Sequence, residues 1–317
     1  MTQMKFTGAV RRVATVLTVG LLATPAFADF PEKPVTVLVG FGAGGGADTL
    51  ARLIGKEAEA ALGQPVVIEN VPGGGGVVAA TKLMNATPDG YTIGMAVTST
   101  FSYAPLASDT VKFDADTFDY LTSAAALQNA VVVGKDSPFN TWEDVVAAGK
   151  SGQKVSFGSS SPAVNLMMNY ISAHDGYEMK VVPTKGGAEI MKDVMGGHMD
   201  MGWSAGIHQR FGDDVKVLAA AGNERLVNSP DVPTFRDLGY DVGDDTYFLF
   251  FAPKGIPDEV FQALHDAFSA GAQKPEVVSM VESKMGFPSK VLMPDQLREN
   301  VAASTAIYEK LIAAAGN

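Results

Sequence analysis

The chain of 317 residues contains no cysteine, which excludes disulfide bonds, cysteine-ligated zinc, iron–sulfur clusters, thiol nucleophiles and a lipid anchor on cysteine. Basic residues are also few, with 24 Lys and Arg against 35 Asp and Glu. Because nucleic acid phosphates are bound by clustered Lys and Arg, we expect no nucleic acid partner. Hydrophobic residues make up 46% of the chain, which argues against intrinsic disorder, and the length predicts about two domains.

The first 28 residues differ from the rest of the chain. Three basic residues and no acidic one precede or flank a short apolar run at 13–24, and small residues surround Phe27. This order is typical of a secretory signal peptide that is cleaved near Ala28. A transmembrane anchor is disfavoured because the run is shorter than the roughly 20 residues that span a bilayer. Because Arg11 and Arg12 form a pair, export by the Sec or by the twin-arginine route stays open.

Beyond residue 28, short apolar runs alternate with helical patterns, which predicts an α/β fold with parallel sheets and helices on both faces. A first series has expected strands at 35–39, 65–68 and 91–97, and helices at 48–62 and 77–85. A second has expected strands at 130–134, 154–158, 180–183, 199–203 and 216–221, and helices at 141–148, 163–174 and 188–195. A strand at 247–252 and helices at 258–270, 275–284 and 294–315 complete the prediction.

Two similar α/β halves in an exported protein predict two lobes that face a cleft and close around a small ligand. We expect residues 29–126 with 247–317 to form the first lobe, and residues 127–246 to form the second. Ligands of such sheets bind at the carboxyl ends of the strands, so the loops that follow the strands are the candidate binding residues.

The glycine-rich loop at 40–45 matches G-x-G-x-x-G, and Glu69 stands where a ribose-binding acid would. A dinucleotide-dependent dehydrogenase is disfavoured because the helix is expected to begin only at Asp48, and because the glycine cluster at 72–76 has no role in dinucleotide binding. Export also separates the protein from cytoplasmic cofactors. The same loop can bind a carboxylate through backbone N–H groups and the positive end of the helix. Asp48 either caps that helix or contacts the ligand.

Residues 202–206 match G-x-S-x-G, the nucleophile elbow of serine hydrolases, with Ser204 at its centre. Asp231 or Asp237, and then His265, follow in the required order. A hydrolase is disfavoured because no helix is expected directly after the motif and His265 falls within a helical pattern. We therefore expect no catalytic residue.

The four histidines lack the spacing of a metal site, so neither a metal nor a cofactor is expected. His208 differs from the others because it falls in a predicted cleft loop near Trp203. It is either an exposed histidine or a donor that selects the ligand. Ser159, Ser160 and Ser161 form either an ordinary loop or a group of hydroxyls that binds a carboxylate before a helix.

Longer motifs resemble one protein family. They lie at 30–34, 39–48, 62–70, 72–76, 88–92, 182–187, 196–200, 230–234 and 252–257, and include Phe-Pro-Glu-Lys-Pro, Pro-Asp-Gly-Tyr-Thr and Ala-Pro-Lys-Gly-Ile-Pro. In this order they resemble the periplasmic substrate-binding proteins of tripartite tricarboxylate transporters, the Bug family. Because these motifs span almost all of the chain beyond residue 28, the resemblance is more specific than either short motif.

The resemblance implies a two-lobed, type II-like periplasmic-binding-protein fold that traps an organic acid in the periplasm. It also implies delivery of that acid to two integral-membrane subunits driven by an ion gradient. In the family, the first glycine loop binds a carboxylate through backbone N–H groups and water. We expect a monomer. An exported enzyme, or a sensor that reports its ligand state to a membrane kinase, remains an alternative.

Two segments depart from the family pattern. Met167 stands roughly where the family has a helical histidine, and residues 203–211 are unlike the family. A pocket of Trp203, Met167 and either Phe101 or Tyr103 would accept an aromatic ring, so aromatic acids and linear di- or tricarboxylates both stay candidate ligands. The predicted ligand-binding residues are Phe41, Gly42, Ala43, Gly44, Gly45, Asp48, Thr98 and Ser99 in the first lobe, and Ser159, Ser160, Ser161, Thr184, Gly186, Trp203, Ser204 and His208 in the second.

Overall fold

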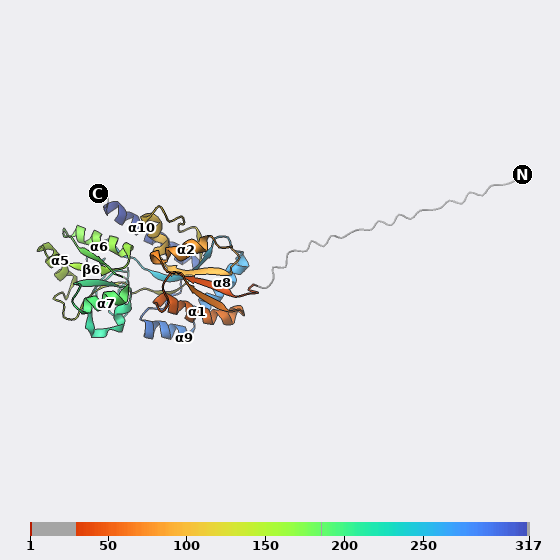
Figure 1. Cartoon of the computed structure of the whole chain (residues 1–317), viewed down its shortest axis with the longest axis horizontal. Helices are drawn as coiled ribbons and strands as arrows, with labels where there is room; N and C mark the ends of the chain where they lie inside the picture. The colour runs from red at the N-terminus through yellow and green to blue at the C-terminus, as the bar shows by residue number, and fades with distance from the viewer. Residues whose placement is uncertain (2–29, 185, 316–317) are drawn as a thin grey trace.

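The structure, a computed structural model, describes residue 1, residues 30–184 and residues 186–315. These residues form two lobes that lie side by side, each built around one five-stranded sheet with helices packed against it (Figure 1). The predicted two-lobed α/β fold is therefore confirmed. The predicted signal peptide at 1–28, with its cleavage site, lies outside the described residues apart from residue 1.

The sheet of the first lobe has the strand order β2-β1-β3-β10-β4. Its strands are β1 (Val35–Val39), β2 (Val66–Asn70), β3 (Thr92–Val97), β4 (Phe118–Ala126) and β10 (Tyr247–Pro253). Its helices are α1 (Gly46–Leu62), α2 (Val77–Met84), α3 (Ser99–Ser102), α4 (Ala104–Ala107), α8 (Asp258–Ala272) and α9 (Pro275–Met280). Helix α9 is shorter than predicted, because a π-helical turn (Val281–Met285) follows it.

The sheet of the second lobe has the strand order β7-β6-β8-β5-β9. Its strands are β5 (Ala130–Gly134), β6 (Ser156–Ser159), β7 (Lys180–Pro183), β8 (Met201–Ser204) and β9 (Val215–Ala220). Its helices are α5 (Trp142–Lys150), α6 (Pro162–His174) and α7 (Gly187–Met195). The predicted strands and helices of this lobe all exist.

Both sheets are mixed: the predicted parallel pairing is confirmed for β1 with β2 and β3 and for β6 with β7 and β8, but it is wrong for β5 and β10. Strand β10 is antiparallel to β3 and β4, and β5 is antiparallel to β8 and β9. In each sheet the antiparallel strand is the one that the chain enters after crossing from the other lobe. A strand that starts at the junction runs away from it, whereas its antiparallel neighbours run toward it. The carboxyl ends of β1, β3, β6 and β8 therefore face the junction of the lobes.

Alternation along the strands gives each sheet a core on both faces. In β10, Phe248 and Phe250 pack with the core of α1 and α8, whereas Leu249 and Phe251 pack on the opposite face. Phe101 belongs to that second core, where its ring meets the rings of four aromatic neighbours. The prediction that Phe101 lines a ligand pocket is therefore wrong.

Helix α10 (Pro294–Ala315) packs on both lobes. Leu297 and Val301 lie in a core of the first lobe, and Tyr308 and Leu311 lie in the main core of the second. Figure 1 shows α10 running from the first lobe to the C-terminus beside the second. The predicted division of the chain, which placed all of 247–317 in the first lobe, did not include this bridge.

A buried carboxyl group, that of Asp244, ties α10 to the crossover that leads into β10. Ser304 and Tyr308 of α10 each donate a hydrogen bond to one of its oxygens, with 2.6 Å between Tyr308 Oη and Asp244 Oδ2. Thr246 Oγ1 lies 3.5 Å from Oδ2 and accepts a hydrogen bond from Asn129 on the other crossover. Burial raises the pKa of Asp244, although the hydrogen bonds from Ser304 and Tyr308 lower it. One polar cluster thus joins both crossovers to the bridging helix.

We expect Tyr308→Phe to lower the free energy of unfolding by about 1–3 kcal/mol, because it removes a hydrogen bond from a buried carboxyl group. Denaturant unfolding followed by circular dichroism measures this loss. The matched control is Tyr170→Phe on α6, because Tyr170 is half-buried and its hydroxyl has no hydrogen-bond partner in the described part of the chain. Equal stability of the two variants would contradict a role for the Asp244 cluster.

Candidate functional site

The predicted carboxylate loop connects β1 with α1. Helix α1 begins at Gly46 with Gly45 as its N-cap, so the predictions that the helix begins at Asp48 and that Asp48 caps it are wrong. Gly45 has no side chain to occupy the first N–H groups of the helix. Among the described residues, the backbone N–H groups of Gly46, Ala47 and Asp48 have no hydrogen-bond partner. Residues 42–45 are exposed and Gly46 is half-buried, whereas Ala47 and Asp48 are buried, so these donors lie at the positive end of a 17-residue helix directly behind an exposed loop.

The carboxylate of Asp48 holds this loop in shape. The N–H of Gly44 donates to its Oδ2 at 2.9 Å, and Arg52 forms an ion pair with Oδ1 at 2.9 Å. Asn70 donates from Nδ2 both to Asp48 Oδ1 and to the carbonyl oxygen of Phe41, each at 3.0 Å. Burial raises the pKa of Asp48, but the hydrogen bonds from Arg52, Gly44 and Asn70 outweigh it and keep the pKa below its usual value. Asp48 is thus ionised and engaged within the loop.

The second loop of the first lobe begins at Thr98, directly after β3. The N–H of Thr98 donates to the carbonyl oxygen of Tyr247, and its hydroxyl accepts from the N–H of Tyr247 at 3.0 Å, so this buried residue joins β3 to β10. Thr100 donates to the carbonyl oxygen of Gly75 at 2.7 Å and so fixes the other glycine cluster. Ser99 is half-buried, and its hydroxyl has no partner among the residues described. Ser99 is the hydroxyl of this loop that is available to a ligand.

The loops of the second lobe meet at the ends of β6 and β7. Ser159 is buried and its hydroxyl accepts from the N–H of Ser161, which in turn caps α6 by accepting from the N–H of Val164. Ser160 is exposed between them. Thr184 donates its N–H to the carbonyl oxygen of Ser159, but its own buried Oγ1 has no hydrogen-bond partner among the residues described.

Asn165, which lies one turn into α6, also has a buried side-chain oxygen without a partner in the described part of the chain. A buried polar atom without a partner costs about 1–3 kcal/mol, which marks Asn165 and Thr184 as candidate ligand contacts. The sequence did not single out Asn165, because nothing in it reveals an unpaired amide. Gly186, the N-cap of α7, has φ 153° and lies next to Lys185, which is outside the described residues.

Trp203 and Met167 belong mainly to the hydrophobic core of the second lobe, with exposed fractions of 8% and 4%. Tyr103 is half-buried, and its ring packs on that of Tyr308 with 5.2 Å between centroids. An aromatic pocket of Trp203, Met167 and Tyr103 would therefore expose little ring surface to a ligand.

Ser204 and His208 form a buried pair. Ser204 Oγ accepts hydrogen bonds from the N–H groups of Gly206 and His208, at 3.2 and 3.1 Å, and lies 2.7 Å from His208 Nδ1. Because these two bonds use both lone pairs of Oγ, the hydroxyl hydrogen points to Nδ1, and the ring proton is on Nε2. Burial lowers the pKa of His208 to about 4. His208 is thus a neutral imidazole with a donor at Nε2.

The residues of the alternative serine hydrolase are not assembled. Ser204 is fully buried in the second lobe, whereas His265 lies in the first lobe with Nδ1 2.7 Å from the carbonyl oxygen of Leu121. Asp237 accepts hydrogen bonds from the N–H of Thr234 and from Arg225. Within the described ranges, no cluster of three or more His, Asp or Glu side chains could hold a metal ion. No helix there is both long and apolar enough to cross a membrane.

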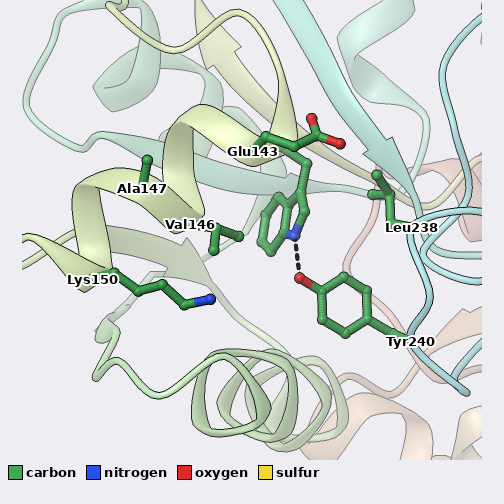
Figure 2. Close-up of a pocket in the computed structure, with 7 residues that line it drawn as sticks. Glu143, Val146, Ala147, Lys150, Leu238 and Tyr240 are labelled. Atoms are coloured by element: carbon green, nitrogen blue, oxygen red, sulfur yellow. Dashed lines mark hydrogen bonds between the residues drawn. The ribbon is translucent and has the colours of Figure 1, made fainter.

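Two cavities stand out. One, which we call the interlobe cavity, has a volume of about 660 Å³ and is lined by both lobes, with His208, Gln209, Arg210 and Asn228 from the second and Glu282 and Lys284 from the first. Of the predicted ligand-binding residues, His208 lines it and the glycine loop does not. The other cavity, of about 310 Å³, lies between α5 and Tyr240 in the second lobe, where Trp142 Nε1 donates to Tyr240 Oη at 2.8 Å (Figure 2).

A family model described as the tripartite tricarboxylate transporter family receptor matches residues 50–316. The chain belongs to this family. The resemblance seen in the sequence is thereby confirmed. A relative from Cupriavidus necator, described as the UPF0065 protein in the gbd 5' region, is 30% identical over 315 residues and covers 94% of each chain.

Solved structures of the same shape include two from Rhodopseudomonas palustris. One, determined with adipate, has a TM-score of 0.79 and 25% identity, covering 91% of this chain and 99% of that chain. The other, MatC with bound malate, has a TM-score of 0.76 and 25% identity, covering 89% of this chain and all of that chain. The receptor therefore shares the fold of periplasmic binding proteins over nearly all of its described length.

The neutral state of His208 predicts a pH dependence of stability. Its pKa of about 4 in the folded receptor lies below the ordinary value of 6.5, so the unfolded chain binds the extra proton more readily. The free energy of unfolding should therefore fall as the pH drops below 6.5, with roughly 3 kcal/mol lost between pH 7 and pH 4 on account of this group. Denaturant unfolding of the parent and of His208→Gln at several pH values measures the contribution of His208 to the free energy of unfolding. Parallel pH curves for the two proteins would contradict it.

Proposed function

We propose that this receptor is an exported solute-binding protein that closes its two lobes around an organic carboxylate and delivers it to a membrane transporter. The observation that carries the proposal is the row of unpaired N–H groups at the start of α1, held open by the ionised Asp48. Such a helix end binds an anion without Lys or Arg, which suits an acidic protein with a formal net charge of −11. The family of the chain supports the same conclusion.

The ligand class that we infer is an aliphatic dicarboxylate. One carboxylate would bind the glycine loop and the hydroxyl of Ser99, and the other would bind Ser160, Thr184 and Asn165 across the cleft. The limited exposure of Trp203 and Met167 argues against a stacked aromatic ring. Two family structures were determined with adipate and with malate, which are both dicarboxylates, and this supports the inference.

Export and assembly belong to the same proposal. The signal peptide would be removed near Ala28, and the receptor would act in the periplasm as a monomer that docks on two integral-membrane subunits. We infer that it is not an enzyme. The buried position of Ser204 and the separate positions of His265 and Asp237 support a binding role.

A thermal-shift screen tests the ligand class. We expect adipate, succinate or malate to raise the melting temperature, because a ligand at 100 times its Kd adds about 2.7 kcal/mol to the free energy of unfolding. Benzoate tests the aromatic alternative, and glucose serves as a neutral control. A shift with benzoate alone would overturn the aliphatic assignment. Stabilisation by glucose and by none of the acids would overturn carboxylate binding itself.

Gly44→Ala tests the glycine loop. Gly44 has φ 79°, so an alanine there strains the backbone that donates to Asp48, and we expect dicarboxylate affinity to fall at least tenfold by calorimetry. Gly63→Ala is the matched control, because Gly63 has φ 68° at the other end of the same helix. With open space at both positions, each variant should lose about 1–2 kcal/mol of stability. Equal affinity of the two variants would refute the loop as the carboxylate site.

A further inference from the structure

Close contacts between the two lobes form one side of the interlobe cavity. A Cβ atom on Gly206 would lie 2.6 Å from the ring of Phe287, and one on Gly286 would lie 2.5 Å from Gln209 Oε1. Phe287 belongs to the core of the first lobe, whereas Gly206 and Gln209 lie in the turn after β8 in the second. The two lobes therefore meet closely along one side of the cavity.

Two hydrogen-bond donors on residues that line this cavity have no acceptor among the residues that the structure describes. Gln209 Oε1 accepts from Asn228 Nδ2 at 2.6 Å, but its own Nε2 is buried and has no partner in the described part of the chain. The neighbouring His208 uses Nδ1 for Ser204, which leaves the Nε2–H free of any partner that the described residues provide. Both residues line the interlobe cavity, and each carries one neutral N–H donor without a partner in the described part of the chain.

The charges at the cavity rim are balanced. Arg210 and Lys284 line it without an ion-pair partner in the described ranges, and the carboxylates of Asp213 and Glu282 line it as well. Hydrogen bonding therefore selects the occupant more than net charge does. Two adjacent donors match a group that has two acceptor oxygens and no hydrogen to donate, which is the chemistry of a carboxylate.

We propose that the interlobe cavity is a second binding site, for a small carboxylate whose oxygens accept hydrogen bonds from Nε2 of His208 and Nε2 of Gln209. This site is separate from the glycine loop, since none of the residues at 41–48 line it. A volume of about 660 Å³ is ample for a short organic acid. The positioning residue is Ser204, whose hydroxyl fixes the proton of His208 on Nε2.

Nuclear magnetic resonance of the ¹⁵N-labelled imidazole groups tests the site in the full protein. The signal of His208 is assigned by its loss in His208→Gln. At pH 7 we expect the pattern of a neutral ring protonated on Nε2. Titration with sodium acetate or sodium succinate, at constant ionic strength set by sodium chloride, should move that signal. A shift with chloride alone would overturn the proposal, as would a ring protonated on Nδ1.

Three variants separate this site from the proposed function. Gln209→Leu should weaken binding at His208 at least tenfold, whereas Gln153→Leu, at an exposed glutamine of the same lobe, should not change it. In Gly44→Ala, titration of His208 should proceed as in the parent even though binding at the glycine loop is lost. If Gly44→Ala abolishes the His208 response, one site explains both results and the second site is refuted. An unaltered affinity in Gln209→Leu also refutes it, without any consequence for the glycine loop.

Discussion

The buried carboxyl group of Asp244 is the interaction on which the two-lobed arrangement depends. It lies on the crossover into β10, and it accepts hydrogen bonds from Ser304 and Tyr308 of the helix that packs on both lobes. Through Thr246 it also reaches Asn129 on the other crossover. Because burial leaves this group no water to bind, losing these partners would leave a buried carboxyl group without hydrogen bonds. The cluster therefore fixes α10 against both crossovers.

A second buried acid, Asp48, holds the glycine loop in shape through its hydrogen bonds. Asp48 is ionised, and it binds the N–H of Gly44, the amide of Asn70 and the guanidinium of Arg52. These bonds shape the loop in the absence of a ligand, so little ordering entropy would oppose the carboxylate binding that we propose there. The negative charge of Asp48 is therefore stabilised by groups of the first lobe alone. Arg52, the cation beside this loop, is engaged by Asp48, so the proposed site relies on the N–H donors at the start of α1.

Local patterns predicted most of the fold, because the spacing of apolar residues within a short segment distinguishes a strand from a helix. Strand β4 was missed, since its Ala, Ser and Thr residues give a weak signal. The direction of β5 and β10 depends on crossovers between lobes, which no local window contains. The glycine loop was found for its composition. Asn165 and Gln209 were not, because an unpaired amide becomes visible only when the surrounding packing is known.

Helix α10 has a consequence for the ends of the chain. Its first turns pack on the first lobe, whereas Tyr308 and Leu311 pack in the core of the second, so the described end of α10 is anchored to the second lobe. A spectroscopic label attached after α10 would thus report the angle between the lobes when paired with one on α1. The helix thus connects the two lobes beside the crossovers. Because one continuous helix is packed on both lobes, a change in the angle between them must bend α10 or break its contacts with one lobe.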